Sequence, residues 1–150
     1  MTSIRPQSQI SQAFESLGVD TEGPDLIDQT AAVGTWLARI GARDGLLTLM
    51  IRHTSASLLI QENADPDVQV DMLDALDRLA PRNQPYAHEV EGPDDMPAHI
   101  KSALTQTSLS IPVRDGRMLL GTWQGIYLVE HRDRPHHREI ALHFIGTMAG

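Results

Sequence analysis

The last third of the chain consists of short segments in which apolar and polar residues alternate, separated by turn residues. The segments that we predict as strands are residues 108–113, 117–120, 124–130 and 139–145. An Asp115-Gly116 pair between the first two is typical of a tight hairpin turn. Because no helical segment alternates with these strands, the pattern does not fit a doubly wound parallel sheet. It favours a largely antiparallel sheet.

The first two thirds of the chain contain three segments with helical periodicity. We predict helices at residues 26–40, 67–80 and 96–104. Between Val33 and Ile40 the apolar residues fall at i, i+3, i+4 and i+7, which places them on one face of the first helix. Pro81 ends the second helix, and either Asp94 or Asp95 is the expected cap of the third.

Further strands are predicted before and between these helices. Residues 8–19 are the expected opening strand, and residues 46–51 form a nearly continuous apolar run, typical of a strand buried on both faces. Ala56, Leu58 and Ile60 continue this run at a period of two. The order of elements predicts one α+β domain over residues 1–150, with helices grouped on one side of the sheet.

Composition excludes several classes of function. The chain has 12 Lys and Arg residues against 20 Asp and Glu residues, a formal net charge of −8, and no cysteine. A nucleic-acid partner is not expected, because its phosphates would need a basic surface. The chain has neither a signal-like start nor an apolar run of about 18 residues, so we expect a cytoplasmic protein without a membrane partner. Without thiolates, any metal must be held by nitrogen and oxygen atoms.

An unusually long loop is predicted over residues 82–94, and loops of this length within a compact domain are often functional. His88 lies in this loop, and Asp95 and His99 follow it, four residues apart on one face of the third helix. The Asp95–His99 pair could bind a metal, or the carboxylate could orient the imidazole as a general base. Alternatively, the pair belongs to a solvated helix face whose acid is favoured by the helix dipole.

Other polar residues stand where apolar strands end. His53 follows the apolar run of residues 46–51 and precedes a string of small and hydroxyl residues, as a strand with one solvated face also would. Asn63, beside Glu62, could bind a carbonyl or phosphate group, or could serve only in the turn before the second helix.

Trp123 and Gln124 stand between two glycines within the strand-rich region. Glycines in such a place indicate a β-bulge or a close approach of the backbone to a ligand. Trp123 could stack on a flat heterocycle that Gln124 hydrogen-bonds, or it could pack beside a bulge. The charged segment that follows, residues 130–138, is expected to be solvated together with its three histidines. Motifs of P-loop, dinucleotide-binding, α/β-hydrolase and zincin proteins are absent from the sequence.

Three stretches of the chain, taken together, resemble a known family. They are HTSASLLIQENADPDVQVDML at residues 53–73, PYAHEVEGPDDMPAHIKSAL at 85–104, and SLSIPVRDGRMLLGTWQGIYLVEH at 108–131. These strings are similar to those of the YjbQ-type family, whose members are described as secondary thiamine-phosphate synthase enzymes. The similarity runs from about residue 44 to the end of the chain, and its most specific part is the G-T-W-Q-G-I element with the upstream D-G-R.

The resemblance implies a small α+β fold that assembles as a homotrimer, with sites near the subunit boundaries. It also implies a pocket in which His53, His88, Asp95 and His99 hold a divalent metal. A nitrogen-rich ligand set favours zinc, with manganese or iron as alternatives.

The activity implied by the resemblance is formation of thiamine phosphate from a pyrimidine diphosphate and a thiazole phosphate. In that reaction a metal would stabilise the departing pyrophosphate, and Asn63, Trp123 and Gln124 would bind the pyrimidine. Asp95, Glu62 and Gln124 are the candidate catalytic residues, with Glu62 as a possible proton acceptor. Two alternatives compete with this one: a metal-dependent phosphate-ester hydrolase in which Asp95 is the base, and a non-catalytic trimeric ligand-binding protein.

Overall fold

The computed structural model of the chain describes residues 1–6 and 9–150, and Ser8, the predicted start of the first strand, lies outside the described residues. In chain order the elements are β1 Ser11–Thr21, β2 Asp25–Asp28, α1 Thr30–Arg39, β3 Ala42–Ile51, β4 Ala56–Glu62, α2 Pro66–Leu79, α3 Asp95–Leu104, β5 Ser108–Arg114, β6 Arg117–Met118, β7 Gln124–Glu130 and β8 His136–Met148. None of these helices is long and apolar enough to cross a membrane.

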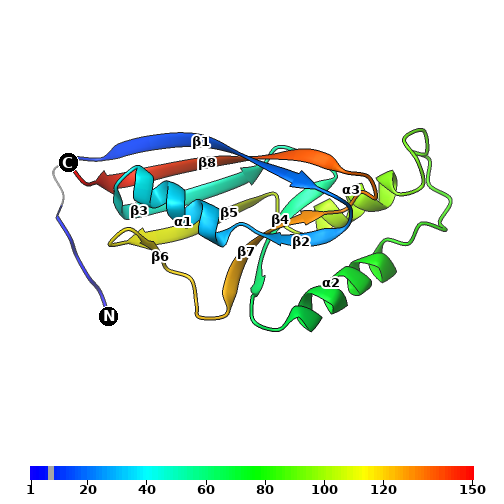
Figure 1. The fold of residues 1–150 in the computed structure, drawn as a ribbon, viewed down its shortest axis with the longest axis horizontal. Coiled ribbons are helices and arrows are strands. Elements are labelled where there is room, and N and C mark those ends of the chain that lie inside the picture. The colour runs from blue at the N-terminus through cyan, green and yellow to red at the C-terminus, as the bar shows by residue number, and fades with distance from the viewer. Residues whose placement is uncertain (7–8) are drawn as a thin grey trace.

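The strands form two antiparallel sheets (Figure 1). The larger sheet has five strands in the order β1-β8-β3-β5-β6, and the smaller has three in the order β2-β7-β4. All pairs of neighbouring strands are antiparallel, so the predicted α+β class with antiparallel pairing is confirmed. The predicted turn at Asp115 and Gly116 joins β5 to β6, with φ angles of 52° and 76°. Positive φ at both central residues is what a type I′ turn requires.

The main hydrophobic core lies between the two sheets and α1. Its fully buried members include Val33 and Leu37 of α1, Leu47 and Leu49 of β3, Leu58 of β4, Ile126 and Leu128 of β7, and Ile140 and Phe144 of β8. Burial of each such side chain stabilises the fold by about 1.5–3 kcal/mol. The opposite face of β7 carries Tyr127 and Val129, which pack with Leu76 of α2. β7 is therefore buried on both faces.

The prediction that residues 46–51 are buried on both faces was wrong. Leu47 and Leu49 point into the core, whereas Leu46 and Met50 are 40% and 50% exposed. A strand of an antiparallel sheet can leave one face outside the core, and β3 does so although its outer residues are apolar. The strand that is buried on both faces is β7.

Three other boundaries differ from the predictions. The first helix begins at Thr30 rather than at residue 26, because Leu26 and Ile27 pair with β7 as the edge strand β2. Ala56 does not continue β3; it opens β4, which belongs to the smaller sheet. Of the strand predicted at residues 117–120, only Arg117–Met118 is paired.

The segment that carries the candidate site lies at one end of the molecule (Figure 1). Residues 80–94 contain no helix or strand, which confirms the loop predicted at residues 82–94, and α3 follows them directly. Side chains at the end of α3 hold it against β4: Ser102 Oγ donates a hydrogen bond to Ala56 O at 3.0 Å, and Thr105 Oγ1 contacts Ser57 Oγ. These bonds fix the helix on the sheet, and its first two turns therefore face the loop in a defined orientation.

Candidate metal centre

A cluster of imidazole and carboxylate groups forms where the loop of residues 80–94 meets the first two turns of α3. Asp95 and His99 lie on one face of the helix, as their spacing predicts. Asp95 is only 1% exposed. His88 reaches the same place from the loop, with its ring centroid 5.5 Å from that of His99. The structure thus brings together three of the four residues implied as metal ligands.

The ligand-type atoms of this cluster converge on one carboxylate oxygen. His88 Nε2 lies 2.6 Å and His99 Nε2 lies 3.0 Å from Asp95 Oδ2. Glu91, which the sequence reading did not select, places Oε2 3.6 Å from His88 Nε2. One ligand atom from each of these four residues lies within 4.8 Å of the others. These residues form what we call the His88–Glu91–Asp95–His99 cluster.

The hydrogen bonds of His99 determine which of its nitrogens carries a proton. Nδ1 lies 2.8 Å from the backbone oxygen of Thr54. Because a carbonyl oxygen can only accept, Nδ1 is the donor, and Nε2 of the neutral ring presents its lone pair to Asp95 Oδ2. A lone pair and a carboxylate oxygen at 3.0 Å repel each other unless a proton or a metal ion lies between them. A proton on Nε2 makes this contact an ordinary His–Asp hydrogen bond, and a metal ion between the two atoms would also satisfy both groups.

Two further charged residues, Arg132 and Asp94, lie beside the cluster and hold Asp95 in place. Arg132 donates hydrogen bonds from Nη1 to Asp95 Oδ1 at 2.7 Å and from Nε to Asp94 Oδ2 at 2.9 Å. Burial disfavours the charged form of Asp94, yet the bonds from Arg132 and from the Asp133 N–H lower its pKa to about 2. Burial likewise opposes ionisation of Asp95, but His88, Glu91, His99 and Arg132 together lower its pKa. Asp94 is the N-cap residue of α3, but it makes no side-chain capping bond, because Arg132 engages its carboxylate instead.

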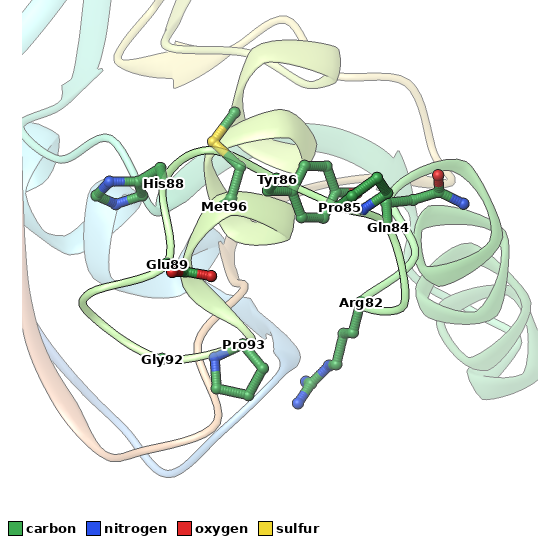
Figure 2. Close-up of a pocket in the computed structure, with 9 residues that line it drawn as sticks. All are labelled: Arg82, Gln84, Pro85, Tyr86, His88, Glu89, Gly92, Pro93 and Met96. Carbon is green, nitrogen blue, oxygen red and sulfur yellow. The ribbon is translucent and has the colours of Figure 1, made fainter.

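A cavity of about 180 Å³ adjoins the cluster. Its walls include Arg82, Tyr86, His88, Glu89 and Met96, and Figure 2 shows these side chains around an open space with His88 at one edge. This volume lies below the range typical of drug-sized ligands, about 300–1,000 Å³. His88 belongs to both the cluster and the cavity wall, so a small molecule held in the cavity would lie beside the cluster.

His53 does not join the cluster within one chain. Its Nε2 accepts a hydrogen bond from the Glu139 N–H at 2.8 Å, and its Nδ1 lies 3.5 Å from Arg138 Nη1. Burial and the charge of Arg138 lower the pKa of His53. In this chain Glu91 takes the fourth place of the cluster.

The residues predicted to bind a heterocycle lie at the other end of β4. Ala56 pairs with Glu130 at one end of the β4–β7 ladder, and Glu62 pairs with Gln124 at the other. At about 3.3 Å per residue the two ends are about 20 Å apart. Because Thr54, at the near end, contacts His99, the cluster and the Glu62–Gln124 end are separated by about this length in one chain.

At that far end the four predicted residues form a turn rather than a pocket. Gln124 Oε1 accepts a hydrogen bond from the Gly121 N–H at 2.7 Å, and the Asn63 N–H donates to Trp123 O at 2.9 Å. Glu62 accepts from the backbone of the following turn. Trp123 is 62% exposed, so it does not pack in the core, and its ring is free for contact with another molecule.

The prediction that residues 130–138 are solvated was wrong at both ends of that range, whereas residues 133–135 and His137 are exposed as predicted. Glu130, His131 and Arg138 are buried, and Arg132 reaches the cluster. Arg138 donates to both carboxylate oxygens of Glu130, which offsets the cost of burying the two charges. Charge density alone did not reveal this, because Glu130 pairs with Arg138 across two strands and Arg132 pairs with Asp95 37 residues away. Glu91 had a detectable signal, since it lies in the long loop three residues after His88.

Comparison with known proteins gives consistent matches along the chain. A sequence model of the family described as "UPF0047 protein YjbQ-like" matches residues 15–147. A UPF0047 protein of Synechocystis sp. is 50% identical over 146 residues, which cover 97% of this chain and 99% of its own. The UPF0047 protein YjbQ of Salmonella typhimurium is 51% identical over 106 residues, covering 71% of this chain and 74% of its own.

Solved structures match as well. A Clostridium acetobutylicum protein described as an uncharacterized conserved protein of the yjbq/upf0047 family superposes with a TM-score of 0.80 at 37% identity, covering 87% of this chain and 98% of the other. A YbjQ-like protein of unknown function from Sulfolobus solfataricus P2 superposes with a TM-score of 0.86 at 23% identity, covering 93% of this chain and all of the other. At that identity the second match shows the shared fold.

Proposed function

The chain belongs to the UPF0047 YjbQ-like family, and we propose that it is a metal-assisted enzyme whose His88–Glu91–Asp95–His99 cluster binds one divalent cation. The observation that carries the proposal is that one ligand-type atom from each of the four residues lies within 4.8 Å of the others, with His99 Nε2 3.0 Å from Asp95 Oδ2. A hydrogen bond from the other ring nitrogen to a backbone carbonyl is also the usual support of a metal-binding histidine, and Thr54 O provides it.

The donor set of the cluster fits zinc. Two imidazole nitrogens and one or two carboxylate oxygens are common zinc ligands, and the absence of cysteine leaves no thiolate to compete. The same nitrogen and oxygen atoms also accept manganese or iron, so zinc is the first metal to test.

The reaction that the cluster supports best is hydrolysis of a small substrate bound in the adjoining cavity. When bound, a divalent ion supplies Lewis-acid polarisation and lowers the pKa of water. Both carboxylate oxygens of Asp95 are engaged, by Arg132 on one side and by the histidines on the other, so Asp95 orients the cluster. Glu91 is the more exposed carboxylate and is the better candidate for a proton acceptor.

Formation of thiamine phosphate is the second candidate, and the exposed ring of Trp123 is what favours it. That reaction needs the pyrimidine-binding residues beside the metal. In one chain Asn63, Trp123 and Gln124 lie about 20 Å from the cluster, so this candidate also needs a second subunit to bring them there.

Metal binding is the first test of the proposal. Metal-free protein titrated with Zn²⁺ against a chromophoric chelator should bind one ion per chain. His99→Ala and Asp95→Asn should each weaken binding by more than about 100-fold, beyond the loss typical of an outer-shell change. His137→Gln, which alters an exposed histidine of β8, is the matched control and should bind zinc normally. Equal binding by all four proteins would refute the proposed site.

Activity is the second test. Zinc-loaded protein assayed against a panel of small neutral esters and phosphate esters should show turnover that His99→Ala lowers by at least about 100-fold, as expected for loss of a principal electrostatic stabiliser. An unchanged rate in the variant would show that the measured activity is incidental to the cluster. The chain would then be better described as a ligand-binding protein.

A further inference from the structure

We infer that Arg132 is the positioning residue of the proposed metal site: it holds Asp95 and the neighbouring backbone in the orientation in which the cluster can bind a cation. The inference rests on the proposed function and assigns a role to a residue in the segment between β7 and β8. Arg132 itself contacts no imidazole of the cluster and has no role as a metal ligand.

The guanidinium of Arg132 uses three nitrogens on three different acceptors. Nη1 donates to Asp95 Oδ1 at 2.7 Å, Nε donates to Asp94 Oδ2 at 2.9 Å, and Nη2 donates to Glu91 O at 3.0 Å. All three acceptors lie in the short stretch that ends the loop and begins α3. One side chain therefore fixes the backbone from which the two carboxylates of the cluster project.

The contact with Asp95 decides which of its oxygens faces the histidines. Because Oδ1 is bound to Arg132, only Oδ2 is left to face His88 and His99, at 2.6 Å and 3.0 Å. Without Arg132 the carboxylate could rotate about its last bond and turn away from the two imidazoles. The planar fork of a guanidinium is suited to this task, whereas the three donors of a lysine share one nitrogen and cannot span three separated acceptors in a fixed plane.

Arg132 is itself anchored to the core of the fold. Its backbone N–H donates to Glu130 Oε1 at 2.9 Å, and the following N–H, of Asp133, donates to Asp94 Oδ2 at 3.0 Å. Glu130 is fully buried and is also bound by Arg138. The side chains of Arg132, Asp94 and Asp95 are largely buried as well, which strengthens their charge-assisted hydrogen bonds. Arg132 thus connects the cluster to buried residues of the sheet, which limit the movement of the cluster.

Charge and positioning predict opposite effects of removing Arg132, which makes the inference testable. By charge alone, loss of a guanidinium close to the bound ion would remove a repulsion and raise the affinity for Zn²⁺. If Arg132 acts by positioning, its loss should lower that affinity by about 10- to 100-fold, as outer-shell changes at metal sites do.

The experiment compares the Zn²⁺ affinity of the full chain with that of Arg132→Gln, Arg132→Lys and Arg134→Gln. Arg134→Gln removes the same charge from an exposed position in the same segment and is the matched control. The visible absorption of Co²⁺-loaded protein is recorded in parallel, because its intensity reports ligand geometry rather than stability. Thermal unfolding of each metal-free variant shows whether it is folded. If a variant is unfolded, Asp94→Asn, which removes the other carboxylate bound by Arg132, is measured in its place.

We expect Arg132→Gln to lose affinity and to change the Co²⁺ spectrum, Arg132→Lys to be intermediate, and Arg134→Gln to match the unaltered protein. Added guanidinium ion should restore part of the affinity of Arg132→Gln. The inference is overturned if Arg132→Gln binds Zn²⁺ as tightly as the unaltered protein, or more tightly, or if Arg134→Gln loses as much. Failure of the unaltered protein to bind Zn²⁺ would instead overturn the proposed function, and with it this role.

Discussion

His131 follows the last residue of β7, is only 2% exposed, and lies with Nε2 2.9 Å from Ser57 Oγ. Burial, together with the charge of Lys101, lowers the pKa of this histidine to about 4. The folded chain therefore holds His131 neutral over a range of pH in which an exposed imidazole, with a pKa near 6.5, takes up a proton. Because of this difference, protonation of His131 makes the free energy of unfolding depend on pH.

The sign of the effect follows from linkage. As pH falls below about 6.5 the unfolded chain binds a proton at His131 before the folded chain does, so stability that is present above this pH is lost towards pH 4. The loss can reach about 3 kcal/mol. Urea unfolding at pH 7.5 and at pH 4.5 should therefore show a smaller pH effect in His131→Gln than in the unaltered protein. His137→Gln, an exposed control, should keep the full pH effect, and equal effects in both variants would contradict the assignment.

At the scale of elements, two glycines face one another in the pairing of β3 with β8. Gly45 pairs with Gly146 beside a shift in register that begins at Ala42. A Cβ atom on Gly146 would overlap the backbone oxygen of Asp44, and one on Gly45 would overlap that of Ile145. Backbone atoms cannot move aside as a flexible side chain can, so this contact of the two strands requires glycine on both.

Replacing glycine by alanine should therefore lower the stability of the protein in β8 and raise it in α1. Gly146→Ala should lower the free energy of unfolding by at least about 2 kcal/mol, because the added methyl group strains the β3–β8 pairing. A Cβ atom on Gly34 of α1 would meet no atom within 4 Å. Gly34→Ala should therefore raise the free energy of unfolding by up to about 1 kcal/mol, the difference in helix propensity. Midpoints of chemical denaturation would measure both. A stabilising effect of Gly146→Ala would show that the two strands are not held this closely in solution.

At the scale of the whole molecule, the outer face of the five-stranded sheet carries apolar side chains that no described part of the chain covers. Phe14, Leu46, Met50 and Ile145 are each at least 40% exposed. Leu46 lies directly across from Ile145, and Phe14 stacks on His143 with ring centroids 4.5 Å apart. Exposed apolar side chains that adjoin in this way are typical of interaction sites. We propose this face as part of the interface of the trimer that the resemblance implies.

Light scattering at micromolar concentration should then give three times the chain mass of 16.5 kDa. Met50→Lys should shift the mass towards that of one chain, because a charged side chain would have to be desolvated in the interface. Val70→Lys makes the same exchange at a similarly exposed position of α2 and should leave the mass unchanged. A single-chain mass for the unaltered protein would refute the trimer, and an unchanged mass for Met50→Lys would exclude this face from the interface.

Local sequence signals were sufficient for the elements whose form depends on near neighbours. α2 and α3 and the Asp115-Gly116 turn were predicted from periodicity, proline placement and turn residues, and the structure has them. The spacing of Asp95 and His99 placed both on one helix face, and family resemblance added His88. The helices, the turn and the Asp95–His99 spacing depend on contacts between residues a few positions apart, so the local sequence is enough to predict them.

Tertiary structure alone decided the features that depend on distant partners. Leu26 and Ile27 have the apolar pattern of a helix start, yet pairing with β7 makes them a strand. Leu46 and Met50 lie within an apolar run, yet they face outward, because only the stacking of the two sheets determines which side of β3 is the core. Arg132 reaches Asp95 across 37 residues, and no spacing rule connects the two. Sequence order specifies the local elements and their candidate ligands, whereas the packing of those elements decides which charges meet.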